Sequence, residues 1–120
     1  MSHELYQVAS WEESDDNASC DIHYDSGHAI FRGHFPGNPI VPGVCTLQMI
    51  MELMERAVGK SLRLVSASNV KYLQLITPDI IPQVALSWTG SGISFNTTAT
   101  LKNSGVTLFK LSAQYGLREP

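Results

Sequence analysis

Residues 33–48, GHFPGNPIVPGVCTLQ, place one histidine in a proline-rich loop that leads into an apolar helical pattern. Histidine exchanges a proton near neutral pH, so His34 is the candidate base of this chain. Pro36, Pro39 and Pro42 restrict the backbone around it. Because a base that is held in few conformations is better placed for catalysis, the loop is typical of an active site.

The start of the helix after this loop has its own chemistry. Pro42 suits a first helical turn, and Gly43 lets a ligand or another backbone come close. The nearest residue of a capping type, Asn38, is too far upstream, so we expect the first amides of the helix to lack a side-chain acceptor. Such amides polarise a carbonyl group or hold an oxyanion. Together with His34, such an amide would be half of a mechanism for removing a proton next to a thioester carbonyl.

This stretch resembles the signature of the β-hydroxyacyl-carrier-protein dehydratases of the hotdog fold, the FabZ and FabA type, which reads roughly F-x-G-H-F-P-x-x-P-x-x-P-G-V. The matching residues are Phe31, Gly33, His34, Phe35, Pro36, Pro39, Pro42, Gly43 and Val44. A second likeness, at residues 70–73 (VKYL) and 77–79 (TPD), is to the strand and turn that follow the central helix in that family. The two likenesses lie between residues 31 and 79 of the chain.

The resemblance implies an α+β hotdog fold, in which an antiparallel sheet wraps around one long central helix. It implies a lyase that removes water from a 3-hydroxyacyl thioester to give a trans-2-enoyl thioester, in fatty-acid or related acyl or polyene biosynthesis. The substrate would be carried on the phosphopantetheine of an acyl carrier protein or on coenzyme A, and no metal or other cofactor is expected. A homodimer, or a larger oligomer built from dimers, would place His34 opposite Gln48 of the partner chain.

The same resemblance assigns roles to individual residues. His34 would remove the C2 proton, while the Gly43 amide would polarise the thioester carbonyl. The expected substrate contacts are Phe35, Pro36, Pro42, Val44 and Glu52, and the expected carrier-protein contact is Arg32.

The chain departs from the family at Gln48, where the family has a glutamate or aspartate that protonates the departing hydroxyl. A glutamine cannot donate a proton in this way, and a general acid contributes about 10²–10⁴-fold to a rate. Glu52 lies one helical turn further along the same face and is a candidate substitute acid. Alternatively, Gln48, Glu52 and Glu55 are an ordinary polar stripe. Its apolar counterpart would be Val44, Leu47, Met51, Met54 and Val58.

Other functions stay open beside the dehydratase. The chain could be a non-catalytic acyl-binding subunit or the partner of an active hotdog protein, or a hotdog thioesterase in which Glu52 or His34 activates water. Cys45 at the helix start could pair with His34 as a nucleophile. His23, His28 and His34 could suggest a metal site, although their spacing matches no ligand motif.

Composition narrows the class of protein. The length supports a single domain over residues 1–120 with one core. The net charge of −3 and the scattered Lys and Arg residues argue against a nucleic-acid partner. No apolar run approaches the about 18 residues of a membrane span, and the N-terminal residues lack a signal-peptide pattern, so we expect a cytoplasmic protein. There Cys20 and Cys45 would be free thiols.

The remaining elements are those that must position the loop and the helix. Partly alternating apolar residues predict a strand pair at residues 5–12 and 18–24, joined by a turn at 14–17. The helix is predicted over 44–58, with Gly59 as its C-terminal cap. Four strands are predicted at 62–76, 83–90, 93–102 and 106–116. This order favours an α+β domain whose sheet covers the apolar helix, independently of the motif.

Overall fold

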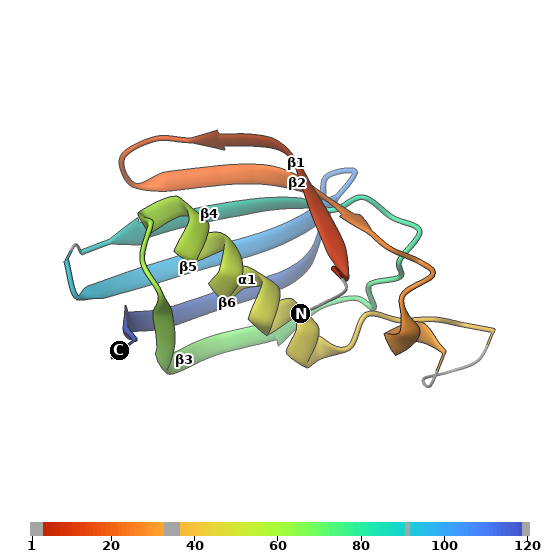
Figure 1. Ribbon diagram of the computed structural model, residues 1–120. Coiled ribbons are helices and arrows are strands. Elements are labelled where there is room, and N and C mark those ends of the chain that lie inside the picture. Colours follow the sequence, from red (N-terminus) through yellow and green to blue (C-terminus); the bar gives the residue numbers. More distant parts are fainter. Residues whose placement is uncertain (1–3, 33–36, 91, 119–120) are drawn as a thin grey trace.

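The computed structural model describes residues 4–32, 37–90 and 92–118. These residues form six strands, one long helix and one short 3-10 turn (Figure 1). The strands are β1 (Tyr6–Glu13), β2 (Asn17–Tyr24), β3 (Leu62–Tyr72), β4 (Gln83–Thr89), β5 (Ser94–Asn103) and β6 (Val106–Leu117). The turn is η1 (Ala29–Phe31) and the long helix is α1 (Gly43–Val58).

The strands make one antiparallel sheet in the order β1-β2-β4-β5-β6-β3. α1 lies across one face of this sheet, which curves around it (Figure 1). The hairpin β1-β2 forms one side, and the chain then passes through α1 to β3 at the opposite edge, where β3 pairs with β6. The predicted α+β arrangement of a sheet wrapped around one helix is confirmed, and it is the hotdog architecture.

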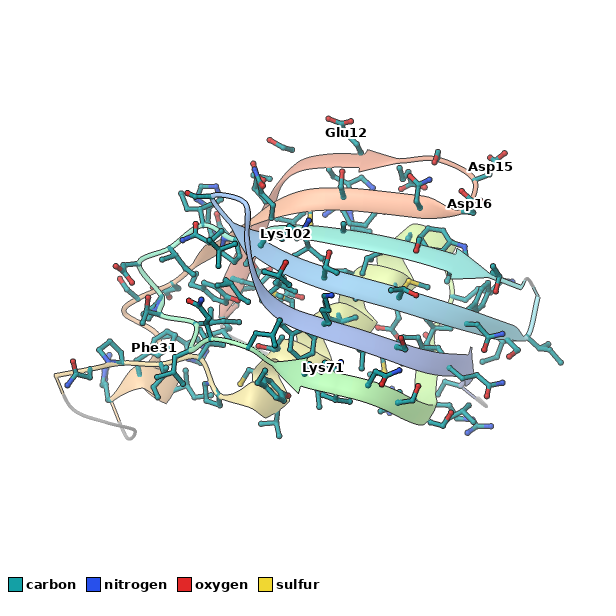
Figure 2. The ribbon with its side chains drawn as sticks, turned by 180° about the vertical axis from the view of Figure 1, so that it is seen from behind. Glu12, Asp15, Asp16, Phe31, Lys71 and Lys102 are labelled. Atoms are coloured by element: carbon teal, nitrogen blue, oxygen red, sulfur yellow. The ribbon has the colours of Figure 1, made fainter. Side chains whose placement is uncertain are left out.

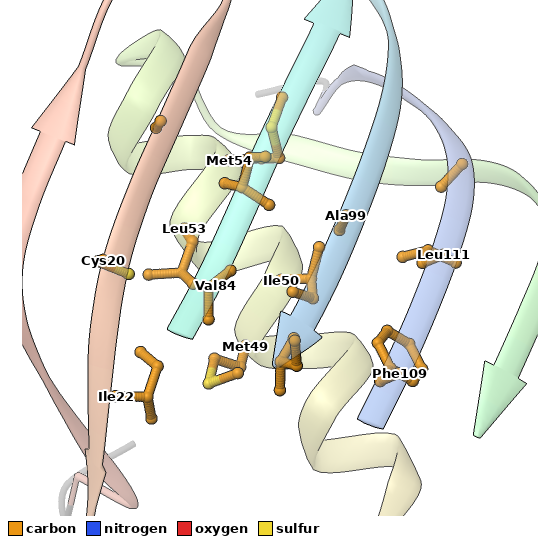
Figure 3. Close-up of a cluster of buried hydrophobic side chains, with 14 of the residues drawn as sticks. Cys20, Ile22, Met49, Ile50, Leu53, Met54, Val84, Ala99, Phe109 and Leu111 are labelled. Carbon is orange, nitrogen blue, oxygen red and sulfur yellow. The ribbon is translucent and has the colours of Figure 1, made fainter. Parts of the chain in front are cut away.

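The core lies between α1 and the sheet. β4 and β5 alternate between buried and exposed side chains, as expected for a sheet that is covered on one face. In Figure 3, Met49, Ile50, Leu53 and Met54 of α1 face the inward side chains of the strands. The labelled strand residues are Cys20, Ile22, Val84, Ala99, Phe109 and Leu111. Removing these apolar side chains from water is the main force that holds the helix on the sheet.

The helix buries a different face from the one that its sequence predicts. The predicted inward stripe was Val44, Leu47, Met51, Met54 and Val58, whereas the buried residues are Thr46, Met49, Ile50, Leu53 and Met54. Val44 is 73% exposed. α1 is apolar around most of its circumference, so the pattern alone does not determine which side meets the sheet.

Both ends of α1 agree with the sequence. The residue before the helix, Pro42, makes no side-chain capping hydrogen bond. At the other end Gly59 takes the left-handed conformation, with φ of 70°, and its amide donates to the Glu55 carbonyl. Glycine adopts this conformation without a Cβ penalty, which is why the helix stops there. Within the described part of the chain, neither α1 nor any other helix has the length and apolar character needed to cross a membrane.

The third strand is shorter than predicted, and nearly all of it is exposed. It ends at Tyr72 instead of residue 76, because the amides of Leu73 and Gln74 both donate to the Leu108 carbonyl and the regular ladder stops. Every residue of β3 after Leu62 is exposed. The exposed apolar side chains of this edge are Leu64, Val65, Val70, Tyr72, Leu73 and Leu75. β3 therefore presents an open, partly apolar edge.

On the outer side of the sheet, the acidic Asp15 and Asp16 lie near one end of β4 and the basic Lys102 lies near the other (Figure 2). Asp15 and Asp16 lie in the β1-β2 turn, and the Asp16 carbonyl accepts from the Trp88 amide near one end of β4. Lys102 pairs with Gln83 at the other end of β4. The residues between are mostly uncharged hydroxyl and amide side chains, among them Ser87, Asn96, Thr98, Ser112 and Gln114.

Candidate active site

The first turn of α1 carries backbone amides that have no acceptor. Cys45 and Thr46 donate to the Pro42 carbonyl, at N···O distances of 2.9 and 3.4 Å. Among the residues that the structure describes, the amides of Gly43 and Val44 have no such partner. They stand at the positive end of the helix dipole, where free N–H groups can hold a carbonyl oxygen or an oxyanion. The predicted uncapped helix start is confirmed.

Tyr72, the last residue of β3, packs against this helix start. Its hydroxyl donates to the Gly43 carbonyl at 2.9 Å, and its ring centroid lies 4.9 Å from that of Phe109. A Cβ atom at position 43 would lie 2.9 Å from the Tyr72 ring. Position 43 is therefore a glycine because Tyr72 occupies the space that a side chain would need.

A cavity of about 370 Å³ opens beside the helix start. Its walls come from the start of α1 and from the segment that follows β3, with Leu73, Leu75 and Ile76 as apolar members. Thr46 also lines it, is only 1% exposed, and its hydroxyl finds no partner among the described residues. A mostly apolar cavity beside a few unpaired polar groups is the usual form of a small-molecule site.

One turn along α1, Gln48 begins a chain of hydrogen bonds. The Gln48 amide nitrogen Nε2 donates to Glu52 Oε2 at 3.1 Å. The Tyr6 hydroxyl of β1 donates to the other carboxylate oxygen, Oε1, in a short hydrogen bond. Gln48 is exposed, while Glu52 and Tyr6 are half-buried beside a cleft of about 570 Å³ between β1 and α1. We call this arrangement the Tyr6–Glu52–Gln48 chain.

In the Tyr6–Glu52–Gln48 chain, each hydrogen bond has a definite donor and acceptor. Burial raises the pKa of the Tyr6 hydroxyl well above its usual range, and its hydrogen bond to Glu52 raises that pKa further. Tyr6 therefore keeps its proton and acts as a donor. Both oxygens of Glu52 accept a hydrogen bond. The Glu52 carboxylate therefore orients the side chains of Tyr6 and Gln48.

The structure places the other predicted site residues as follows. Pro42 and Val44 lie beside Gly43 at the helix start, and the Val44 side chain extends away from the core. Arg32 is exposed after η1, where its guanidinium donates to the Gly27 carbonyl at 3.5 Å. His34, Phe35 and Pro36 lie outside the described residues. Their roles as base and substrate contacts stay predictions.

The two competing sites from the sequence gain no support from the described residues. Burial raises the pKa of the Cys45 thiol, which disfavours a thiolate nucleophile at neutral pH. Both Cys45 and Cys20 are free thiols, as predicted. His28 accepts from the Ile30 amide at Nδ1 and caps η1. Among the residues described, no group of three or more His, Cys, Asp or Glu side chains is placed to hold a metal ion.

Sequence reasoning missed three residues near the site. Tyr72 belongs to the VKYL segment of the second likeness, which could have drawn attention to it. Thr46 carried a weaker signal, since it is the one polar residue between Val44 and Leu47. Tyr6 carried none, because its partner Glu52 is 46 positions away and belongs to a different element.

Comparison with known proteins assigns the chain to a family. The profile of the ApeI-like family, described as ApeI dehydratase, matches residues 10–107. The chain belongs to the ApeI-like dehydratases. Among curated relatives, it is 33% identical over 55 residues to the 3-hydroxyacyl-[acyl-carrier-protein] dehydratase FabZ of Oenococcus oeni. It is 32% identical over 56 residues to the FabZ of Clostridium acetobutylicum. Each match covers 40% of the relative's length. The matches cover 40% and 41% of this chain, respectively.

Solved structures agree with the architecture of this ApeI-like chain. The dehydratase heterocomplex ApeI:P from Xenorhabdus doucetiae is similar with a TM-score of 0.77 and 19% identity, over 92% of this chain and 97% of that one. A hypothetical thioesterase with coenzyme A from Streptococcus pneumoniae is similar with a TM-score of 0.63 and 16% identity, over 97% and 93%. At such identities these likenesses establish the hotdog fold and leave the reaction to be argued from the site.

Proposed function

We propose that this ApeI-like protein is a dehydratase of 3-hydroxyacyl thioesters carried by an acyl carrier protein or coenzyme A. The observation that carries the proposal is the pair of unpaired amides at Gly43 and Val44 beside the cavity of about 370 Å³. The thioester carbonyl would accept from these amides, which acidifies the C2 proton by stabilising the negative charge that develops on the carbonyl oxygen. His34 would take that proton.

The elimination must also supply a proton to the leaving group. When the C2–H bond breaks, its electron pair forms the new C=C bond and the C3–O bond breaks, so the hydroxyl leaves as water only if it gains a proton. Gln48 cannot supply it, and both oxygens of Glu52 are engaged as acceptors. In this proposal the donor is His34, which has just received the C2 proton. Gln48 would orient the hydroxyl group.

The active unit in this proposal is a dimer. The exposed edge of β3 ends at Tyr72, which contacts the helix start, so a partner that pairs with this edge would lie beside the site. Gln48 and Val44 are exposed in the single chain, and a partner subunit would cover them. That subunit would be a second copy of this chain, or a different chain as in the ApeI:P heterocomplex. Arg32 remains the proposed contact to the carrier protein.

A second candidate function rests on Gln48 itself. With an amide in place of the acid, the chain could bind acyl thioesters without converting them and serve as the partner of an active subunit. The expectation of this alternative is copurification with a second hotdog protein and no turnover by the isolated chain.

The deciding experiment is turnover of a 3-hydroxyacyl carrier-protein thioester followed by mass spectrometry, with wild type beside His34→Ala. Loss of water that is abolished in His34→Ala supports the dehydratase. A silent wild type that still binds the thioester supports the non-catalytic subunit. Loss of the whole acyl group would overturn both and indicate a thioesterase.

A further inference from the structure

We propose that Tyr6 and Glu52 are positioning residues, which hold the Gln48 side-chain amide with its carbonyl oxygen toward the ligand and so select thioesters that carry a hydroxyl group at C3. The inference deepens the proposed function and rests on it for the class of ligand. It assigns a role to two residues outside the signature loop. It also gives Gln48 the part of a hydrogen-bond acceptor, where an acid would be a donor.

The geometry begins with three side chains from two elements. Gln48 and Glu52 are four residues apart on α1, so they lie one above the other on the same side of the helix. Tyr6 reaches Glu52 from β1. Arg56, one turn further along, stacks over the Trp11 ring with its guanidinium carbon 4.4 Å from the ring centroid. That cation–π contact directs Arg56 toward Trp11, and the hydrogen bonds to Glu52 come from Tyr6 and Gln48.

The carboxylate determines which way the amide faces. A carboxylate only accepts hydrogen bonds, and a glutamine amide has a donor end and an acceptor end on opposite sides. Only the NH₂ end of Gln48 can face Glu52, as the contact of 3.1 Å shows. The reversed amide would place two acceptor oxygens against each other. The Gln48 carbonyl oxygen is therefore directed away from Glu52.

Tyr6 makes this orientation durable. Its hydroxyl is a donor with a raised pKa, so it stays protonated through the neutral range and keeps one Glu52 oxygen occupied. The other oxygen is left for Gln48. Because Tyr6 and Glu52 are half-buried between β1 and α1, the pair is less free to rotate than two surface side chains would be.

A fixed acceptor distinguishes ligands by what they offer at C3. A 3-hydroxyacyl chain offers a hydroxyl that can donate to the Gln48 oxygen. A 3-oxoacyl chain offers only an acceptor and would leave both oxygens without a hydrogen. Because a polar group left without a partner is penalised where water is excluded, the preference for the hydroxyl should be roughly tenfold once a partner subunit covers Gln48.

The test compares the binding of two unreactive ligands by calorimetry, the amide analogues of a 3-hydroxyacyl and a 3-oxoacyl pantetheine of equal length. Wild type should prefer the hydroxyl analogue by roughly tenfold. Glu52→Gln should lose or invert this preference, because a neutral amide at position 52 allows Gln48 to turn its NH₂ toward the ligand. Tyr6→Phe should reduce the preference. An unchanged preference in Glu52→Gln overturns the inference.

Tyr24→Phe is the matched control. Tyr24 pairs with Tyr6 across β1 and β2, and its buried hydroxyl has no partner in the described part of the chain. Tyr24→Phe removes a hydroxyl group, as Tyr6→Phe does, but at a neighbouring residue that makes no hydrogen bond to Glu52. The preference should stay at the wild-type value, and a loss equal to that of Tyr6→Phe would count against a specific role for Tyr6.

A measurement without ligand separates this inference from the proposed function. In the NMR spectrum, the side-chain NH₂ resonances of Gln48 should differ from those of a free glutamine and should move in Glu52→Gln but not in Tyr24→Phe. Resonances at free-glutamine positions in wild type would overturn the Tyr6–Glu52–Gln48 chain. If neither analogue binds while the resonances behave as expected, the proposed thioester function is wrong and the hydrogen-bond chain stands.

Discussion

At position 48 a side-chain amide is hydrogen-bonded to a carboxylate one helical turn away. A substitution at position 48 therefore has two effects. It changes the chemistry of the side chain at this position, and it changes the charge next to Glu52. The unpaired amides of Gly43 and Val44 are independent of that pair. The two parts of the site can therefore be tested separately.

Gln48→Glu should raise dehydration at least about tenfold, because it restores a general acid. The introduced carboxyl group would lie beside the Glu52 carboxylate, which raises the pKa of that new group and so enlarges its protonated fraction. The rate should therefore fall as the pH rises through this pKa. Initial rates between pH 5 and pH 9 measure this. In Gln48→Glu combined with Glu52→Gln, the fall should shift to lower pH, and a profile that does not move would contradict the explanation.

Gly43→Ala should reduce turnover by about tenfold or more while changing stability little. The added methyl group would lie 2.9 Å from Tyr72, whose half-exposed side chain must swing away and lose its hydrogen bond to the Gly43 carbonyl. Steady-state kinetics and thermal unfolding measure the two effects. In a Tyr72→Ala background the same substitution should have a much smaller effect on turnover, because the clash is gone. Equal effects in both backgrounds would show that Tyr72 is not involved.

The features of the site that depend on residues close together in the sequence could be predicted. The absence of a cap before Gly43 could be read directly, since capping acts over a few positions. The contacts of Tyr72 with Gly43 and of Tyr6 with Glu52 join residues 29 and 46 positions apart. Such pairs arise only when β1 and β3 are folded against α1. Hydrophobic periodicity carries no information about them.

At the scale of the elements, the strands were predictable and the orientation of the helix was not. Alternation in β4 and β5 is unambiguous, because one face is buried and the other is exposed. α1 has apolar residues on several sides, and the side that faces the sheet differs from the predicted stripe. The most exposed apolar side chain of α1 is Val44, and in the proposed dimer the partner subunit would cover it.

Val70→Lys should weaken the proposed dimer, because it places a charge on the open edge of β3. Val70 is 38% exposed, and Val106→Lys is the matched control, since Val106 is 48% exposed and begins β6 beyond the last pair with β3. Sedimentation over a range of concentrations measures the oligomer. Wild type and Val106→Lys should remain dimeric where Val70→Lys is a monomer. Dimers of equal strength in all three would place the interface elsewhere.

For the molecule as a whole, burial raises the pKa values of a thiol and of several tyrosine hydroxyls. Burial raises the pKa of Cys20 to about 11 and that of Tyr115 to about 12. The pKa values of Tyr6 and Tyr24 are raised as well, again mainly by burial. All four groups are neutral when protonated, so the fold favours their protonated forms.

Stability should therefore fall at alkaline pH. Because the unfolded chain loses the Cys20 proton near pH 9 and the folded chain only near pH 11, the contribution of this group is complete below pH 9 and is lost as the pH rises to 11. The loss is at most ~2–3 kcal/mol for Cys20. Denaturant unfolding at pH 8 and pH 11 measures it. Cys20→Ala should show a smaller difference between the two pH values, and an unchanged difference would assign the effect to the tyrosines.

The open edge of β3 also determines the fate of a subunit that has no partner. Residues 64–70, LVSASNV, contain no charge and no proline, and their backbone groups on the outer side are free to pair with any extended chain. The charged side chains of the flanking Arg63 and Lys71, and the two irregularities in the pairing of β3 with β6, oppose edge-to-edge growth. In the proposed dimer a partner subunit would cover this edge, so a subunit without a partner would expose a strand to which other extended chains can add.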